Sequence, residues 1–433
     1  MKNLQSVLIA YSSALLDGLT PGSSLAVIQM NLANSFVSFP FFLVFRENSM
    51  KAPLDNVRVV DLTRVLSGPF CTAMLADIGA EVIKIEHPDG GDDARHFGPF
   101  KNDQSLYFAL INRNKKSISL DLKEGLAIEK LKELVRGADI LVENFRPGVT
   151  KRLGVDYETM REINPRLIYL SISGFGQDGP LSGKPAFDTV VQAMSGIMAT
   201  TGTEASGPTR VGESIADIMT GIYGAWALST ALYSRTVNNE GVYLDLAMFD
   251  ALFASQITNV SQLIATNAAP SRVGNRHPTS APFDSFTASD GQVIIAAPTK
   301  IMFDQLCNLM GQPDLCNDAR FLTEASRMQF EPELKLIIEK WTSTHSCADI
   351  IRMCGEVGIP VGPIWDIKAA ADSENARNRN LLSDISHPVF ETMQYVMQPV
   401  RFGDYRPSIK PEPELGANNS EIRDGILLDQ TDL

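Results

Sequence analysis

The residue best suited to chemistry is Asp188, which ends a run beginning at Tyr169 and precedes a helix-like stretch over residues 189–198. The run starts as an apolar, β-prone segment and then becomes rich in turn residues, with four glycines and two prolines. A carboxylate at the start of a helix meets free backbone N–H groups and a partial positive charge, so it stays ionised and held in place. These properties suit either a helix cap or a covalent nucleophile.

A glycine-rich stretch lies upstream of Asp188, and its sequence, Gly174-Phe-Gly-Gln-Asp-Gly179, has the GxGxxG spacing of a dinucleotide-binding turn. Such a turn leads directly into a helix, whereas Pro180 and Pro185 interrupt any helix here. Asp188 also comes too early to be the acid that binds a ribose. We therefore interpret the stretch as a flexible loop whose backbone can approach a ligand closely.

Other catalytic signatures are missing from the sequence, which has no GxxxxGK[ST], HExxH or GxSxG motif. The histidines, at positions 87, 96, 277, 345 and 387, are scattered and none has metal-ligand spacing to another histidine or a cysteine. We therefore expect neither a metal site nor a catalytic triad built on histidine.

Two polar groups lie next to expected strands. The basic run from Asn112 to Lys116 leads into a strand and is either a solvated turn or a site that captures a phosphate group. Asn144 and Arg146 follow the carboxyl end of another strand. Because open α/β sheets bind ligands at that end, both side chains either face a ligand or are ordinary turn residues.

Composition sets broad limits on the protein. The chain has 433 residues and a formal net charge of −13, which predicts two or three domains and argues against a general nucleic-acid binder. Five cysteines without a CxxC pair indicate reduced core cysteines of a cytoplasmic protein. Residues 1–49 are apolar and rich in Ser and Asn, without a membrane span or a clear targeting signal. We expect this extra segment to lie outside the fold and the natural protein to start near Met50.

Short apolar strands alternate with helices through the first half of the chain. Strands are expected over residues 57–62, 81–86, 116–120, 139–143 and 167–173, and helices over 69–79, 124–137 and 157–163. This alternation predicts an α/β fold, with a Rossmann-like parallel sheet covered on both faces in a large domain over residues 50–235.

After residue 240 the pattern changes. We expect a strand over 242–246, one helix over 249–266, a loop over 267–282, a hairpin turning at Asp290-Gly291, and helices over 302–310, 332–342 and 347–356. These elements predict a smaller α+β domain over residues 236–375. Residues 376–433 are expected to form an extended return linker and a C-terminal segment that packs on the large domain.

Seven segments of the chain are distinctive when taken together: VVDLTRVLSGPFCTAMLADIGAEVIKIEHPDGGDDAR, LYFALINRNKKSISLDLK, ADILVENFRPG, LGVDYETMREINPRLIYLSISGFGQDGP, PAFDTVVQAMSG, ESIADIMTGIYGAWAL and GIPVGPI. As a set they resemble the class III CoA-transferases, the CaiB/BaiF family that includes formyl-CoA transferase. The resemblance covers roughly residues 54–425, and its opening block and NRNKKSI run are similar to the dicarboxylate members of the family.

The resemblance implies that Asp188 carries the acyl group and that a CoA thioester is a substrate, with no tightly bound cofactor. His87 replaces a CoA-contacting arginine of formyl-CoA transferase, and a segment around Gly274, Asn275 and His277 replaces that enzyme's glycine run over the active site. The implied CoA-binding residues are Val65, Leu66, Ser67, His87, Leu120, Lys123, Asn144, Phe145, Arg152 and Leu153.

The family also implies substrates, a partner and two alternatives. The substrates are an acyl-CoA and a carboxylic acid, and Arg64, Arg113 and Arg276 are candidates to bind a second carboxylate of a dicarboxylate. The partner is a second copy in an interlocked homodimer, with neither nucleic acid nor membrane involved. One alternative is an α-methylacyl-CoA racemase, which needs a histidine before the aspartate where this chain has Phe187. The other is a CoA-binding protein without catalysis.

Overall fold

The computed structural model describes residues 26–32, 35–41 and 50–423. Contacts divide the chain into two compact units, one containing residues up to Lys51 together with Phe402–Tyr405, the other Ala52–Arg401 with the residues from Arg406 onward. In the first unit β1 (Ala26–Leu32) pairs antiparallel with β2 (Ser35–Phe41). The remainder of the predicted extra segment lies outside the described residues, and the residues proposed for the site belong to the second unit.

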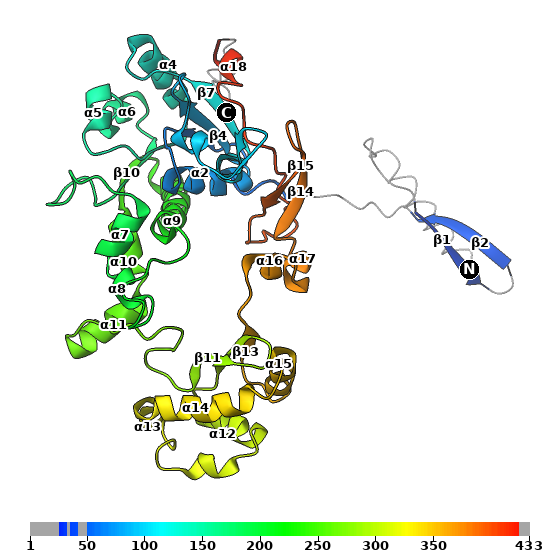
Figure 1. The fold of residues 1–433 in the computed structure, drawn as a ribbon. Helices are drawn as coiled ribbons and strands as arrows, with labels where there is room; N and C mark the ends of the chain where they lie inside the picture. The colour runs from blue at the N-terminus through cyan, green and yellow to red at the C-terminus, as the bar shows by residue number, and fades with distance from the viewer. Residues whose placement is uncertain (1–25, 33–34, 42–49, 424–433) are drawn as a thin grey trace. The chain divides into compact units, whose positions relative to one another are not determined.

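A six-stranded parallel sheet forms the centre of the second unit, with strand order β10-β9-β8-β3-β4-β7 (Figure 1). The inner strands are short apolar runs that are buried on both faces, as a parallel sheet covered by helices requires. The predicted α/β class is therefore confirmed. The strands are β3 (Arg58–Asp61), β4 (Glu81–Glu86), β7 (Lys115–Ser119), β8 (Ile140–Glu143), β9 (Ile168–Ser173) and β10 (Val242–Ala247).

Helices cover both faces of this sheet. One face packs against α4 (Gly125–Arg136) and α6 (Tyr157–Ile163), the other against α2 (Ser67–Asp77) and α9 (Ile215–Asn238). The two helices α2 and α9 cross closely at glycines, because a Cβ at Gly221 would lie 3.0 Å from the Ser67 carbonyl oxygen. A Cβ at Gly224 would lie 2.9 Å from the Cys71 sulfur. This contact brings the N-terminal ends of both helices to the same side of the sheet.

Shorter elements complete this part of the chain. The sheet continues past residue 235, because β10 pairs with β9. One correction to the predicted elements concerns the helices that follow this strand. The predicted helix over 249–266 is two helices, interrupted at Ser255 and Gln256. The elements are a 3-10 turn (Asp93–His96), β5 (Phe100–Lys101), β6 (Gln104–Ser105), α3 (Leu106–Asn112), α5 (Val149–Leu153), α7 (Asp188–Met194), α8 (Ile197–Thr200), α10 (Met248–Ala254) and α11 (Ile257–Thr266).

A second core forms around an antiparallel sheet of order β11-β12-β13. The predicted hairpin is present, with Phe286 opposite Val293, and a cluster that includes Phe303 and Phe321 packs the helices onto it. The division into domains at particular residues stays a prediction. The elements are β11 (Phe283–Thr287), β12 (Gln292–Ala296), α12 (Lys300–Leu309), a 3-10 turn (Pro313–Asn317), α13 (Glu324–Gln329), α14 (Glu331–Thr342), α15 (Cys347–Glu356) and β13 (Val361–Pro363).

The segment predicted as an extended return linker, residues 376–433, begins with the end of a helix and a hairpin before it becomes extended. This hairpin was not predicted, and in its second strand Met393 and Tyr395 are buried against α3 residues. The elements are α16 (Ile367–Ala371), α17 (Glu374–Arg379), β14 (Leu382–His387), β15 (Glu391–Val396) and, after an extended stretch, α18 (Asn419–Arg423).

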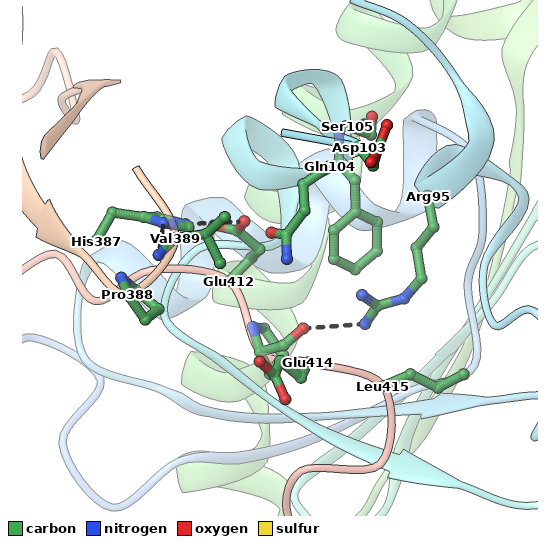
Figure 2. Close-up of a pocket in the computed structure, with 12 residues that line it drawn as sticks. Arg95, Asp103, Gln104, Ser105, His387, Pro388, Val389, Glu412, Glu414 and Leu415 are labelled. Atoms are coloured by element: carbon green, nitrogen blue, oxygen red, sulfur yellow. Dashed lines mark hydrogen bonds and ion pairs between the residues drawn. The ribbon is translucent and has the colours of Figure 1, made fainter. Parts of the chain in front are cut away.

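The extended stretch, residues 406–418, runs along β7, the edge strand of the large sheet. The backbone N–H of Ser117 donates to Asn418 Oδ1 and that of Ser119 to Asn419 Oδ1, both at 2.9 Å. A cavity of about 220 Å³ is lined by residues of this stretch and by Arg95, which donates to the Pro413 carbonyl at 3.0 Å. Figure 2 shows side chains that line this cavity. His387 Nε2 lies 3.1 Å from Glu412 Oε1. These contacts attach the stretch to the large sheet.

Two further observations concern the described residues. Among them we find no helix that combines the length and the apolar character needed to cross a bilayer. All five cysteines are free thiols, and Cys71, Cys307 and Cys354 are buried.

Candidate active site

The site begins at the turn after β3, which a buried ion pair holds in an uncommon conformation. Val65 has a φ of 71°, a left-handed conformation that a β-branched residue rarely adopts. Its N–H donates to Asp92 Oδ1 at 2.9 Å, and the other oxygen of Asp92 lies 2.8 Å from the buried Lys84 Nζ. Burial opposes ionisation of Asp92, but Lys84 and the donated hydrogen bonds lower its pKa. Asp92 therefore acts as a charged anchor for this turn.

A second turn, after β8, is fastened to the first by Asn144. The Arg64 N–H donates to Asn144 Oδ1 at 2.9 Å, and Asn144 Nδ2 donates to the Arg64 carbonyl at 2.8 Å. The amide of Asn144 is thus occupied by backbone, although the residue still lines a cavity. Arg146 is exposed and lines the same cavity, as the ligand-facing interpretation expects.

The larger of two cavities at these strand ends has a volume of about 450 Å³, which is in the usual range for a small-molecule site. Its walls combine apolar side chains with cations, a mixture that suits a heterocyclic base and its phosphates. His87 Nε2 lies 3.7 Å from Asp121 Oδ2 at its edge. Six of the predicted CoA-binding residues line this cavity: His87, Leu120, Lys123, Phe145, Arg152 and Leu153.

The smaller cavity, of about 170 Å³, shares Arg64 and Phe145 with the larger one. Four predicted CoA-binding residues line it: Val65, Ser67, Asn144 and Phe145. The opposite wall consists of residues that precede α7 or begin α9, including Gly174, Ala186, Phe187 and Asp217. The remaining predicted residue, Leu66, is buried in an apolar cluster and lines neither cavity.

Asp188 is the first residue of α7 and directly follows Phe187, which lines the smaller cavity, whereas Asp188 itself lines neither cavity. Its side chain is 6% exposed. The Oδ2 atom accepts a hydrogen bond from Gln192 Nε2 at 2.7 Å, and Oδ1 accepts one from the backbone N–H of Ala216 at 2.8 Å. Ala216 is in the first turn of α9, so the carboxylate lies at the N-terminal end of that helix. Asp188 therefore does not cap its own helix, and both of its oxygens are fixed.

Asp217 is the residue that the sequence analysis missed. It lines the smaller cavity from the first turn of α9, together with Ser67, the first residue of α2. Burial, followed by the negative charge of Asp188, raises its pKa to about 7, although the hydroxyl and N–H donors of Ser67 act to lower it. A signal was present, because Asp217 is an acid inside the otherwise apolar run of residues 215–228.

The glycine loop after β9 packs tightly against the segment that leads to Asp188. A Cβ at Gly174 would lie 2.3 Å from the Ala186 Cβ, so only glycine fits there. Gly176 and Gly179 have φ values of 90° and 86°. Turns rather than a helix follow up to α7, as expected for a close-approach loop and not for a dinucleotide fingerprint.

The loop predicted over the active site lies against other segments. The Gly274 N–H donates to the Gly202 carbonyl at 2.9 Å, and Asn275 Nδ2 donates to Ser285 Oγ at 3.2 Å. The His277 ring stacks on Phe283 with centroids 5.1 Å apart. None of Gly274, Asn275 and His277 lines either cavity, so their role in catalysis stays a prediction.

The basic run is neither a solvated turn nor a phosphate site, because its side chains form internal ion pairs. Arg113 is buried against Asp77, with Nε donating to Oδ1 at 2.9 Å. The buried Lys115 Nζ donates to Asp61 Oδ2 at 3.0 Å. Arg113 therefore cannot meet a substrate carboxylate.

The other two predicted carboxylate-binding arginines differ in position. Arg276 Nε lies 3.5 Å from Glu331 and lines neither cavity, whereas Arg64 lines both. In the part of the chain that the structure describes, no three histidine, cysteine or acidic side chains gather as a metal site would require.

An open parallel sheet with two connected cavities at its strand ends, and a buried carboxylate beside them, defines the class of an α/β enzyme that binds an extended ligand. Comparison specifies the family. Residues 54–419 match the family described as CoA-transferase family III, and the chain belongs to this family. It is therefore an enzyme that transfers CoA between an acyl-CoA and a carboxylic acid.

Individual relatives agree with this assignment. The chain is 46% identical to acetyl-CoA:oxalate CoA-transferase of Acetobacter aceti over 77% of its own length and 86% of the relative's. It is 35% identical to succinyl-CoA:glutarate CoA-transferase of Mus musculus, over 88% and 87% of the two chains. The crystal structure of a CaiB/BaiF family protein from Brucella suis superposes with a TM-score of 0.77 at 34% identity, covering 88% of this chain and all of that one.

Proposed function

We propose that Asp188 is the nucleophile that carries the acyl group and then CoA. The observation that supports this role is the pair of neutral donors on its oxygens, Gln192 Nε2 and the Ala216 N–H. No cation forms an ion pair with Asp188 among the described residues, so its negative charge is not neutralised by a salt bridge. A buried, fixed and unneutralised carboxylate beside a cavity has the properties that covalent catalysis needs.

The proposed reaction proceeds through two kinds of covalent intermediate. An oxygen of Asp188 attacks the donor thioester, the C–S bond breaks, and a mixed anhydride and CoA thiolate form. The thiolate attacks the aspartyl carbonyl, which releases the donor acid and leaves an aspartyl-CoA thioester. The acceptor carboxylate attacks this thioester, and the returning thiolate then takes the acceptor acyl group. Correct placement of such reactants contributes up to ~7–11 kcal/mol to the barrier reduction.

CoA is proposed to extend through both cavities. The base and phosphates occupy the larger cavity, where Lys123 and Arg152 supply positive charge next to apolar walls and His87 offers a ring nitrogen for hydrogen bonding. The thiol end reaches the smaller cavity, past Phe145, which lines both. Binding energy from the distant nucleotide end then holds the thioester against Asp188, which is how a poor nucleophile becomes effective.

We further propose that the acceptor is a dicarboxylate and the donor succinyl-CoA or another small acyl-CoA. The names of the Acetobacter aceti and Mus musculus relatives specify oxalate and glutarate, which are both dicarboxylic acids. In this chain Arg146 and Lys184 line the smaller cavity and are exposed, without an ion-pair partner among the described residues. Either side chain can bind the carboxylate that does not react. A racemase finds no support, because no histidine lines the smaller cavity.

The remaining proposals concern assembly and location. Trp226, Tyr233 and Val237 form an exposed apolar stripe on α9, with side chains 65%, 73% and 72% exposed. Such a stripe supports the interlocked homodimer, because a second copy would cover it. Trp226→Glu is expected to give monomers in analytical ultracentrifugation, and unchanged sedimentation would argue against this face as the interface.

The five free thiols support a cytoplasmic location.

Asp188→Ala tests the proposed nucleophile. We expect the variant to bind CoA with unchanged affinity in calorimetry but to lose CoA transfer. Wild-type enzyme incubated with succinyl-CoA should form a hydroxylamine-sensitive adduct that mass spectrometry places on Asp188, and the variant should not. Asp178→Ala, which changes an exposed aspartate on the neighbouring loop, is the matched control. Near-normal turnover of Asp188→Ala would overturn the proposal.

A further inference from the structure

The first turn of α9 connects two carboxyl groups. The Ala216 N–H holds Asp188 Oδ1 at 2.8 Å, and the next residue, Asp217, lines the smaller cavity. Ser67 and Phe187 line the same cavity, which places Asp217 between the predicted CoA-binding turn and the residue that precedes the proposed nucleophile. Asp217 therefore lines the cavity proposed for the thiol end of CoA and directly follows the residue that holds Asp188, although the reaction as proposed above gives it no task.

Its surroundings favour a carboxyl group that exchanges a proton. From α2, Ser67 lines the same cavity, and its hydroxyl and N–H donors act to lower the pKa of Asp217. From α7, Asp188 contributes a negative charge. On α3, the pKa of Tyr107 is raised by burial and, next, by the negative charge of Asp217. No cation is paired with Asp217 among the described residues. The other charged side chains that line the cavity are Arg64, Asp93, Arg146 and Lys184.

We propose that Asp217 is the acid and base that holds the thiol proton of CoA during transfer. This inference rests on the proposed function of Asp188. When the Asp188 oxygen bonds to the donor acyl carbon and the C–S bond breaks, the electron pair stays on sulfur. Asp217 gives its proton to that sulfur, so the site contains a neutral thiol and an Asp217 carboxylate. When the sulfur attacks the aspartyl carbonyl, Asp217 takes the proton back.

The charge on Asp188 supplies the timing of this exchange. While Asp188 is a free carboxylate, its charge helps to keep the pKa of Asp217 near 7, and Asp217 holds its proton. Acylation removes that charge, so the pKa of Asp217 falls and the proton becomes available when the thiolate appears. An ordinary thiol, with a pKa near 8.5, differs from Asp217 by a factor of about 30 in acidity, which allows transfer in both directions.

The structural alternative is that Asp217 only holds the start of α2 through Ser67. Asp217→Asn separates the two roles, because the amide oxygen can still accept the Ser67 N–H but the amide cannot exchange a proton. If Asp217 is the acid and base, kcat of the variant falls by about 10²–10⁴. The wild-type dependence of kcat on pH near 7 disappears in the variant, KM for acyl-CoA changes less than twofold, and hydroxylamine still traps an adduct on Asp188.

Asp250→Asn is the matched control, since Asp250 is an exposed acid in the first turn of α10 that lines neither cavity, and this variant is expected to keep the wild-type profile. The proposal is overturned if Asp217→Asn has the kcat of wild-type enzyme or if its kcat shows the wild-type dependence on pH. It is also overturned if the variant differs from wild type only in a higher KM. If Asp217→Asn does not fold, the pH dependence and the solvent deuterium isotope effect of kcat are measured on wild-type enzyme. A kcat that shows neither a dependence on pH near 7 nor an isotope effect contradicts proton transfer by Asp217. Failure of the Asp188 proposal is distinguished by an absent adduct in wild-type enzyme.

Discussion

Replacing Glu143 with glutamine should change the stability of the protein in a way that depends on pH. Glu143 is the last residue of β8 and is 2% exposed. Burial, with a smaller contribution from the charge of Asp245, raises its pKa to about 7, although Ser171 and the Phe145 N–H donate hydrogen bonds to it. Between pH 4.5 and about 7, Glu143 is therefore protonated in the folded protein but ionised in the unfolded chain, where its pKa has the ordinary value of 4.5.

The sign and size of the effect follow from this difference. Because the pKa of the acid is higher in the folded state, its contribution to stability is full below pH 4.5 and declines as the pH rises toward 7. Each pKa unit corresponds to 1.36 kcal/mol, so ionised Glu143 costs about 3 kcal/mol at pH 8. Glutamine stays neutral and its carbonyl can still accept the Phe145 N–H. We expect Glu143→Gln to exceed the unfolding free energy of wild type by less than about 1 kcal/mol at pH 5 and by about 3 kcal/mol at pH 8.

Urea denaturation followed by tryptophan fluorescence at both pH values measures this difference. Glu162→Gln, an exposed glutamate on α6, is the matched control and should change the unfolding free energy equally at pH 5 and pH 8. The reasoning is refuted if Glu143→Gln shows the same difference from wild type at both pH values, or if it is the less stable protein at pH 8. Either result would mean that Glu143 is not held protonated by burial.

Two other substitutions test the parts of the site that position its turns. Asp92→Asn should lower the unfolding free energy by about 3–5 kcal/mol, because it leaves the Lys84 charge buried without its partner. The variant should also bind CoA more weakly in calorimetry, and unchanged stability would contradict the anchoring role. Gly174→Ala places a Cβ 2.3 Å from the Ala186 Cβ, so the segment leading to Asp188 must move, and we expect kcat to fall at least ~10-fold with CoA affinity retained. A wild-type kcat would show that the segment adjusts without moving Asp188.

Strong local patterns explain why much of the sheet could be predicted. β4 and α6 begin and end at the predicted residues, because in each short segment the apolar residues of the sequence recur with the period of a strand or a helix. The absence of a helix directly after the glycine loop was also predicted, since Pro180 excludes one there on local grounds alone. For the same reason the sequence places Asp188 close to the start of a helix.

What could not be predicted depends on contacts between distant segments. The helix α9 was missed because it is apolar around most of its surface, and its glycines serve a close contact with α2 that sequence does not reveal. Asp188 and Ala216 are 28 residues apart, so nothing local indicates that the carboxylate accepts the N–H of another helix. The basic run was misjudged because Lys115 is paired with Asp61, on a neighbouring part of the sheet.

The extended stretch along β7 has a consequence for synthesis of the protein on the ribosome. Ser117 and Asn418, which are hydrogen-bonded at the sheet edge, are 301 residues apart in the chain. At 5–20 residues per second, the edge strand has to wait about 15–60 seconds for the segment that covers it. During that time an unpaired strand edge is available to other nascent chains. The protein is therefore expected to need chaperone protection late in its synthesis. This holds even though the first half of the chain, which contains β7, has the more regular alternation of strands and helices in its sequence.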